Sequence, residues 1–108
     1  MKDIEQYQKI SVLHCVYQLI ASADGSIDEE RDEAAINLAL SELGLTSIYS
    51  WDSAQQLNPH DCFLHVASLN HSDRQLFQTL LYSIANMGGN NAFRLTCAKH
   101  IIQLCVAE

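Results

Sequence analysis

Two apolar helical patterns meet at the stretch Ala21-Ser22-Ala23-Asp24-Gly25-Ser26-Ile27-Asp28-Glu29-Glu30-Arg31-Asp32-Glu33, which carries six of the thirteen acidic residues of the chain. The Asp24-Gly25 pair predicts a tight turn, because glycine accepts a positive φ and an aspartate side chain can bond to nearby backbone. Ser26 and Glu29 have the spacing of a capping box, which predicts that a second helix begins here. The chain is therefore expected to reverse direction between two helices.

The composition limits the class of protein. A length of 108 residues, with 48% hydrophobic and 18% charged residues, is typical of one globular domain spanning residues 1–108. The net charge of −7 argues against nucleic-acid binding and against an anionic membrane surface, and favours a cation or a basic protein partner. The chain shows no pattern long and apolar enough to span a bilayer and lacks the basic start of a signal peptide. We therefore expect a cytoplasmic protein.

Hydrophobic periodicity predicts an all-α fold, a bundle of about five to six helices without strands. The first helix is expected from Asp3, as its cap, to about Ser22, with its apolar residues on one buried face. The second is expected from about Ile27 to Leu43. Gly44 then closes it as a left-handed C-cap, the position at which glycine has the lowest steric cost.

The second half of the chain carries further helix signals. The strongest is Asn58-Pro59, because asparagine caps a helix and proline suits its first position. Trp51, the only tryptophan, is interpreted as a lid on the core. The remaining signals are Ser50 as the cap of a short helix, a Ser72/Gln75 capping box before a long one, Gly88-Gly89 as its end, and Asn90 or Asn91 as the cap of the last helix.

An internal repeat is also expected. Placing Gly89 over Gly25 aligns two helix–turn–helix units, which predicts two pseudo-repeated helical hairpins. The second turn, residues 88–93, contains no acidic residue, so the chemistry of the first turn is not repeated there.

Cysteine and histidine side chains are candidate metal ligands or nucleophiles. The spacing of the four cysteines contains no CxxC pair, and their apolar flanks predict buried reduced thiols: Cys15, Cys62, Cys97 and Cys105. His60, Cys62 and His65 lie close together near a helix start. They suit either a zinc site or two surface histidines beside a buried thiol, and we favour the second interpretation. A hydrolase with a Cys–His pair would have no supporting motif, so we expect no enzyme.

The acidic stretch has two interpretations. Carboxylates at Asp24, Asp28, Glu29 and Glu30 could hold a divalent cation. Alternatively, acidic residues at the start of a helix offset its macrodipole, and Asp28, Asp32 and Glu33 form a solvated interaction surface. A true EF-hand loop is excluded, because Ile20, Ser22 and Arg31 would occupy ligand positions.

The run from Ile20 to Glu30, between two amphipathic helices, resembles the TerB-like family, which includes the tellurite-resistance protein TerB and the N-terminal domain of DjlA-type co-chaperones. The resemblance implies an all-α fold of two helical hairpins and an accessory role in bacterial stress response, by binding and not by catalysis. It also implies that Asp24, Asp28, Glu29 and Glu30 form a cation-binding patch. Arg31 and the acid-free second turn depart from the family pattern, so any metal affinity should be weak.

These observations lead to one principal hypothesis. We expect a non-enzymatic TerB-like protein that binds a basic protein partner through the acidic surface of Asp28, Asp32 and Glu33. The alternative is weak divalent-metal binding or sensing at the Asp24-Gly25 turn, with no other cofactor. The apolar helix faces also allow a homodimer.

Overall fold

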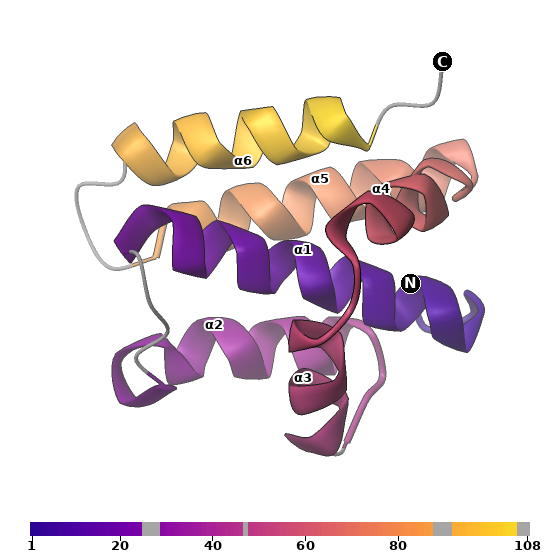
Figure 1. Cartoon of the computed structure of the whole chain (residues 1–108), viewed down its shortest axis with the longest axis horizontal. Helices are drawn as coiled ribbons and strands as arrows, with labels where there is room; N and C mark the ends of the chain where they lie inside the picture. The colour runs from indigo at the N-terminus through magenta and orange to yellow at the C-terminus, as the bar shows by residue number, and fades with distance from the viewer. Residues whose placement is uncertain (25–28, 47, 88–91, 106–108) are drawn as a thin grey trace.

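The computed structural model of the chain describes residues 1–24, 29–46, 48–87 and 92–105. These ranges form six α-helices and no strand, which confirms the predicted all-α fold (Figure 1). A Cα radius of gyration of 12.5 Å matches the value of about 13 Å expected for one compact domain of this size. The helices are α1 (Gln6–Asp24), α2 (Glu29–Glu42), α3 (Ile48–Gln55), α4 (Pro59–Ala67), α5 (His71–Ala85) and α6 (Ala92–Leu104).

Helix α1 lies at the centre of the bundle and packs against each of the other five helices. In Figure 1 it runs between α2 and α3 on one side and α4, α5 and α6 on the other. The six consecutive residues 11–16 are all buried, and they include the polar Ser11 and His14. The predicted single buried face is therefore wrong for the middle of this helix, because neighbours cover it all round. Tyr7, which the periodicity also predicts on the buried face, is 50% exposed.

The ends of the first two helices are set by local hydrogen bonds. Helix α1 begins at Gln6 and not near Asp3, and the Glu5 N–H donates to Gln8 Oε1 at 3.1 Å. In a capping box, the side chain of the third helical residue accepts from the N–H of the residue before the helix, as Gln8 does here. Gly44 has φ +69°, and the Leu45 N–H donates to the Leu40 carbonyl at 2.9 Å, which is the Schellman C-cap. The prediction for Gly44 is confirmed.

The caps of the later helices confirm one prediction and correct two. Asn58 accepts a hydrogen bond from the Asp61 N–H at 3.2 Å, as expected. Helix α5 is capped by Asn70, which accepts from the Asp73 N–H at 2.8 Å, so Ser72 lies inside the helix and caps nothing. Ser50 likewise lies inside α3, which begins two residues earlier. In both cases the helix begins earlier in the chain than the serine that was predicted as its cap.

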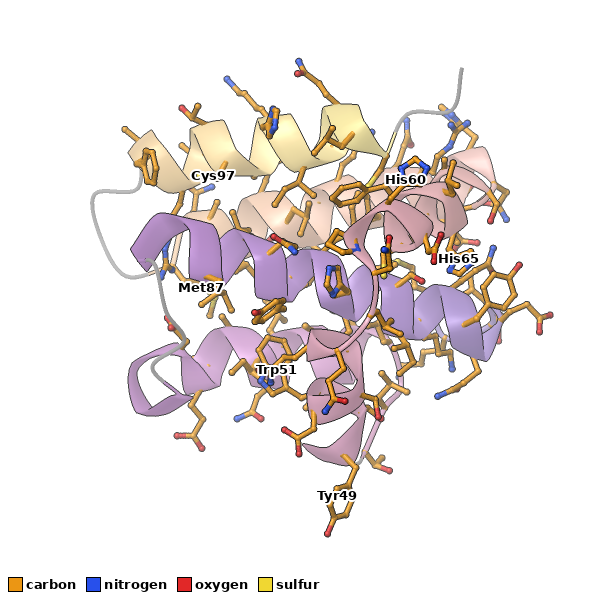
Figure 2. All side chains as sticks on the ribbon, viewed as in Figure 1. Tyr49, Trp51, His60, His65, Met87 and Cys97 are labelled. Carbon is orange, nitrogen blue, oxygen red and sulfur yellow. The ribbon has the colours of Figure 1, made fainter. Side chains whose placement is uncertain are left out.

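The remaining predictions have mixed outcomes. Trp51 is completely buried, as expected of a lid on the core, and contacts the edge of Tyr17 at 6.2 Å between ring centroids (Figure 2). Helix α5 ends at Ala85, before the predicted Gly88-Gly89 stop. That turn, the Asn90/Asn91 cap and Ser26 lie outside the described residues. The pairs α1–α2 and α5–α6 each pack together, but their origin as a repeat stays a prediction.

Candidate functional site

The predicted cation site flanks the turn between α1 and α2. Asp24 is the last residue of α1 and Glu29 the first of α2. Asp28 lies outside the described residues, as do the side chains of Asp24, Glu29 and Glu30. Among the side chains that are described, no group of three histidine, cysteine or acidic residues could hold a metal ion. A cation at the turn therefore stays a prediction.

Two neighbouring acids of the predicted interaction surface face different environments. Asp32 is only 4% exposed, and its Oδ1 lies 3.3 Å from Nη2 of Arg94 on α6. Glu33, the next residue, is exposed. Successive residues of an α-helix point about 100° apart, so one carboxylate turns inward and the other outward. Asp32 joins α2 to α6, whereas Glu33 remains available to a partner.

The His60, Cys62 and His65 group does not converge on one point. His60 is exposed and Cys62 is buried. His65 is half-buried, with Nδ1 at 2.9 Å from Ser11 Oγ and its ring edge-on to Tyr7. Figure 2 places the two histidines at separate points on the outside of the bundle. Burial raises the pKa of the Cys62 thiol, with a smaller contribution from Asp61. The structure thus agrees with a buried thiol beside two histidines of the outer part of the bundle, of which His65 contacts Ser11 and Tyr7.

Two of the buried thiols contact each other. Sγ of Cys15, in the middle of α1, lies 3.9 Å from Sγ of Cys105, the residue after α6. The hydrogen bond with Cys105, together with burial, raises the pKa of the Cys15 thiol well above its ordinary value. All four cysteines are free, Cys15, Cys62 and Cys105 are buried, and Cys97 is half-buried. The prediction of buried reduced thiols is confirmed for Cys15, Cys62 and Cys105.

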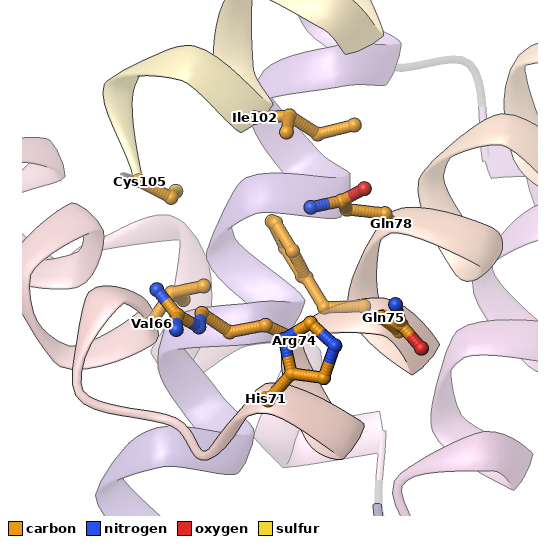
Figure 3. A pocket seen from close by; sticks show the side chains of 8 residues that line it. Val66, His71, Arg74, Gln75, Gln78, Ile102 and Cys105 are labelled. Carbon is orange, nitrogen blue, oxygen red and sulfur yellow. The ribbon is translucent and has the colours of Figure 1, made fainter. Parts of the chain in front are cut away.

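A pocket of about 270 Å³ reaches one thiol of this pair, Cys105, from outside. It lies between the end of α4, the first half of α5 and the end of α6 (Figure 3). The side chain of Arg74 extends across it toward Val66, and Cys105 and Ile102 close the α6 side. We call it the thiol pocket, and its lining residues are Val66, His71, Arg74, Gln75, Phe77, Gln78, Ile102 and Cys105.

A second cavity, of about 280 Å³, carries acidic side chains. Asp3 and Glu5 approach it from the N-terminal segment, and Asp73 from the first turn of α5. We call this cavity, lined also by Ile4, Gln8, Ser68, Leu69 and Asn70, the acidic hollow. Sequence reasoning missed it because Asp73 lies far along the chain from Asp3 and Glu5, and only the packing of α1 against α4 and α5 brings them together.

The partners of Asp32 and Cys15 were also missed. Arg94 is 62 residues from Asp32, and Cys105 is 90 residues from Cys15. No local pattern encodes contacts of this length. The one available signal was that both cysteines have apolar flanks, which indicates burial but not which thiols meet.

Comparison with known proteins gives no match to this chain among protein-family models, curated proteins or solved structures. None of the helices in the described ranges is both long and apolar enough to cross a membrane.

Proposed function

We propose that this chain is a non-enzymatic interaction module of the TerB-like type, a bacterial stress-associated accessory protein that binds a basic protein surface. The contact is made by Glu33, which is exposed on α2, together with Asp28, which precedes this helix in the sequence. Asp32, which the sequence placed on the same surface, instead serves to hold α2 against α6.

The observation that carries this proposal is the position of α2 at an edge of the bundle. It packs mainly against α1, and its outer side is free of the other five helices in Figure 1. Glu33 is exposed on it. The net charge of −7 adds a long-range attraction for basic partners. Exposed carboxylates on a helix supported from one side suit a docking surface whose specificity comes from charge complementarity.

The state of two thiols supports a role without catalysis. The thiolate is the nucleophilic form of cysteine, and the raised pKa of Cys15 and of Cys62 keeps both protonated near neutral pH. Neither has the electropositive, accessible surroundings of a catalytic cysteine.

A matched pair of charge variants tests the proposal. Asp28→Asn with Glu33→Gln removes two carboxylates of the predicted interaction surface, and Asp3→Asn with Glu5→Gln removes the same charge at the acidic hollow. Partners captured from the native host by the unmodified protein are then titrated against all three proteins by calorimetry. We expect the α2 variant to bind on the order of tenfold more weakly, since each exposed ion pair contributes up to about 1 kcal/mol.

The control variant should bind as the native protein does, and higher salt should weaken the native complex. Weaker binding by the acidic-hollow variant alone would move the interaction surface to that cavity. Equal affinity in all three proteins would show that neither acidic surface contacts the partner.

A further inference from the structure

The Cys15–Cys105 contact brings two free thiols together in the interior of the bundle. The two sulfurs are 3.9 Å apart and belong to the middle of α1 and to the residue that follows α6. A disulfide bond is about 2.05 Å long, so the sulfurs need to approach by roughly 2 Å. This approach requires side-chain rotation and a shift of Cys105, which follows α6, an outer helix in Figure 1.

The two thiols differ in access to solvent. Cys105 lines the thiol pocket, whereas Cys15 has no exposed surface and does not line it. The pocket volume of about 270 Å³ is several times the volume of about 30 Å³ that one water molecule takes up. Its polar side chains, His71, Arg74, Gln75 and Gln78, can hydrogen-bond a small polar oxidant such as hydrogen peroxide. An oxidant therefore reaches Cys105 first.

We propose that Cys105 is a thiol oxidation site and that Cys15 converts it to a reversible internal disulfide. In the first step, Sγ of Cys105, as the thiolate, attacks one oxygen of hydrogen peroxide; the O–O bond breaks, Cys105 becomes a sulfenic acid, and hydroxide leaves. In the second step, Sγ of Cys15 loses its proton and attacks the sulfenic sulfur; the S–O bond breaks and water leaves. Overall, two thiols and one peroxide give one disulfide and two waters.

The contacts favour Cys15 over the other thiols as the partner of Cys105. The Cys15 thiol already contacts the Cys105 thiol at 3.9 Å, so its sulfur lies beside the site of attack. Cys62 is close enough to influence both thiols electrostatically, but it does not line the thiol pocket. Cys97, on the opposite half of α6, does not line the thiol pocket (Figure 2).

Oxidation would change how α6 is held. In the reduced protein the end of α6 contacts α1 through a weak sulfur hydrogen bond, and in the oxidised protein a covalent bond fixes it there. A disulfide that forms in a reducing compartment is transient and reports on oxidants. The activity implied by this chemistry is thiol-based peroxide sensing, which is independent of the acidic surface of α2.

The experiment treats the folded native protein with increasing hydrogen peroxide until Cys97 begins to react, and follows it by intact mass and peptide mapping. We expect one internal Cys15–Cys105 disulfide per chain, seen as the loss of both thiol hydrogens, before Cys97 is modified. A thiol reductant should reverse it. In Cys15→Ala the sulfenic acid of Cys105 should persist and react with dimedone.

Cys62→Ala and Cys97→Ala are the matched controls and should form the same disulfide as the native protein. The proposal is overturned if Cys97 is modified while Cys15 and Cys105 remain thiols. It is also overturned if the mapped bond joins Cys62 to either of them, or if Cys105→Ala still yields an internal disulfide. Because the native protein alone supplies the mapping result, the test does not depend on any variant folding.

Discussion

Helices α1 and α6 are of similar hydrophobic character, yet they are held in opposite ways. The middle of α1 is buried on all sides, whereas only Ala98 and Ile101 are buried within α6. Helix α6 is instead fixed near its two ends, by the Arg94–Asp32 ion pair and by the contact of Cys105 with Cys15. Helix α1 is therefore held by core packing all round, whereas α6 combines a narrower packed side with one ion pair and one sulfur contact.

The largest expected effect comes from opening a cavity in α1. Leu13→Ala removes a completely buried side chain and should lower the free energy of unfolding by about 2 to 5 kcal/mol. The matched change on the outer helix is Leu104→Ala, at a residue that is 47% exposed, and it should cost less than about 0.5 kcal/mol. Urea unfolding followed by circular dichroism measures both. Equal losses in the two variants would contradict the comparison.

The ion pair should give the next largest effect. Arg94→Met leaves the carboxylate of Asp32 buried without that partner. We expect the free energy of unfolding to fall by about 2 to 3 kcal/mol. This is less than the full cost of breaking a buried pair, because Arg94 retains some exposure. Adding Asp32→Leu should recover most of the loss, since an apolar pair of similar volume avoids the buried charge. The unfolding free energies of both variants and of Asp32→Leu complete a double-mutant cycle. Additive single losses would show that the two residues do not interact.

Alkaline pH should weaken the protein through its buried thiols. The pKa of Cys15 is raised in the folded state, so the unfolded chain releases this proton first as pH rises. Stability is therefore complete below the ordinary thiol pKa of 9.0 and falls above it, by up to about 1.4 kcal/mol per pH unit for each such group. Unfolding curves between neutral and alkaline pH should show a shallower fall for Cys15→Ala. An identical pH dependence in that variant would exclude this cause.

The smallest expected effect concerns the end of α1 that leads into the acidic turn. If the turn binds calcium with a dissociation constant near ~1 mM, as in weak protein sites, an equal free concentration adds only about 0.4 kcal/mol of stability. A thermal melt with and without calcium measures the shift, and Asp24→Asn with Asp28→Asn should abolish it. A shift of the same size in that double variant would place the ion elsewhere.

The sequence predicted those parts of the fold that depend on local chemistry. Asn58 and Gly44 were identified correctly, because an asparagine cap and a left-handed glycine act within one helical turn. The burial of His14 could not be predicted, because its partner is distant in the chain. The carbonyl oxygen of Ala54, 40 residues away, lies 2.7 Å from His14 Nδ1 in the fold. At the candidate site, Asp32 shows the same limit. Its type and helix were evident, but its inward direction depends on Arg94 from another helix.

Burial of Trp51 also has a spectroscopic consequence. It is the single tryptophan of the chain, it is shielded from water, and no residue in the described ranges accepts a hydrogen bond from its indole N–H. Its fluorescence should therefore peak at short wavelength in the folded protein and shift to the red on unfolding. Tyr17, in edge contact with the indole, can transfer excitation to it. The emission of one residue thus reports directly on whether α3 remains seated against α1.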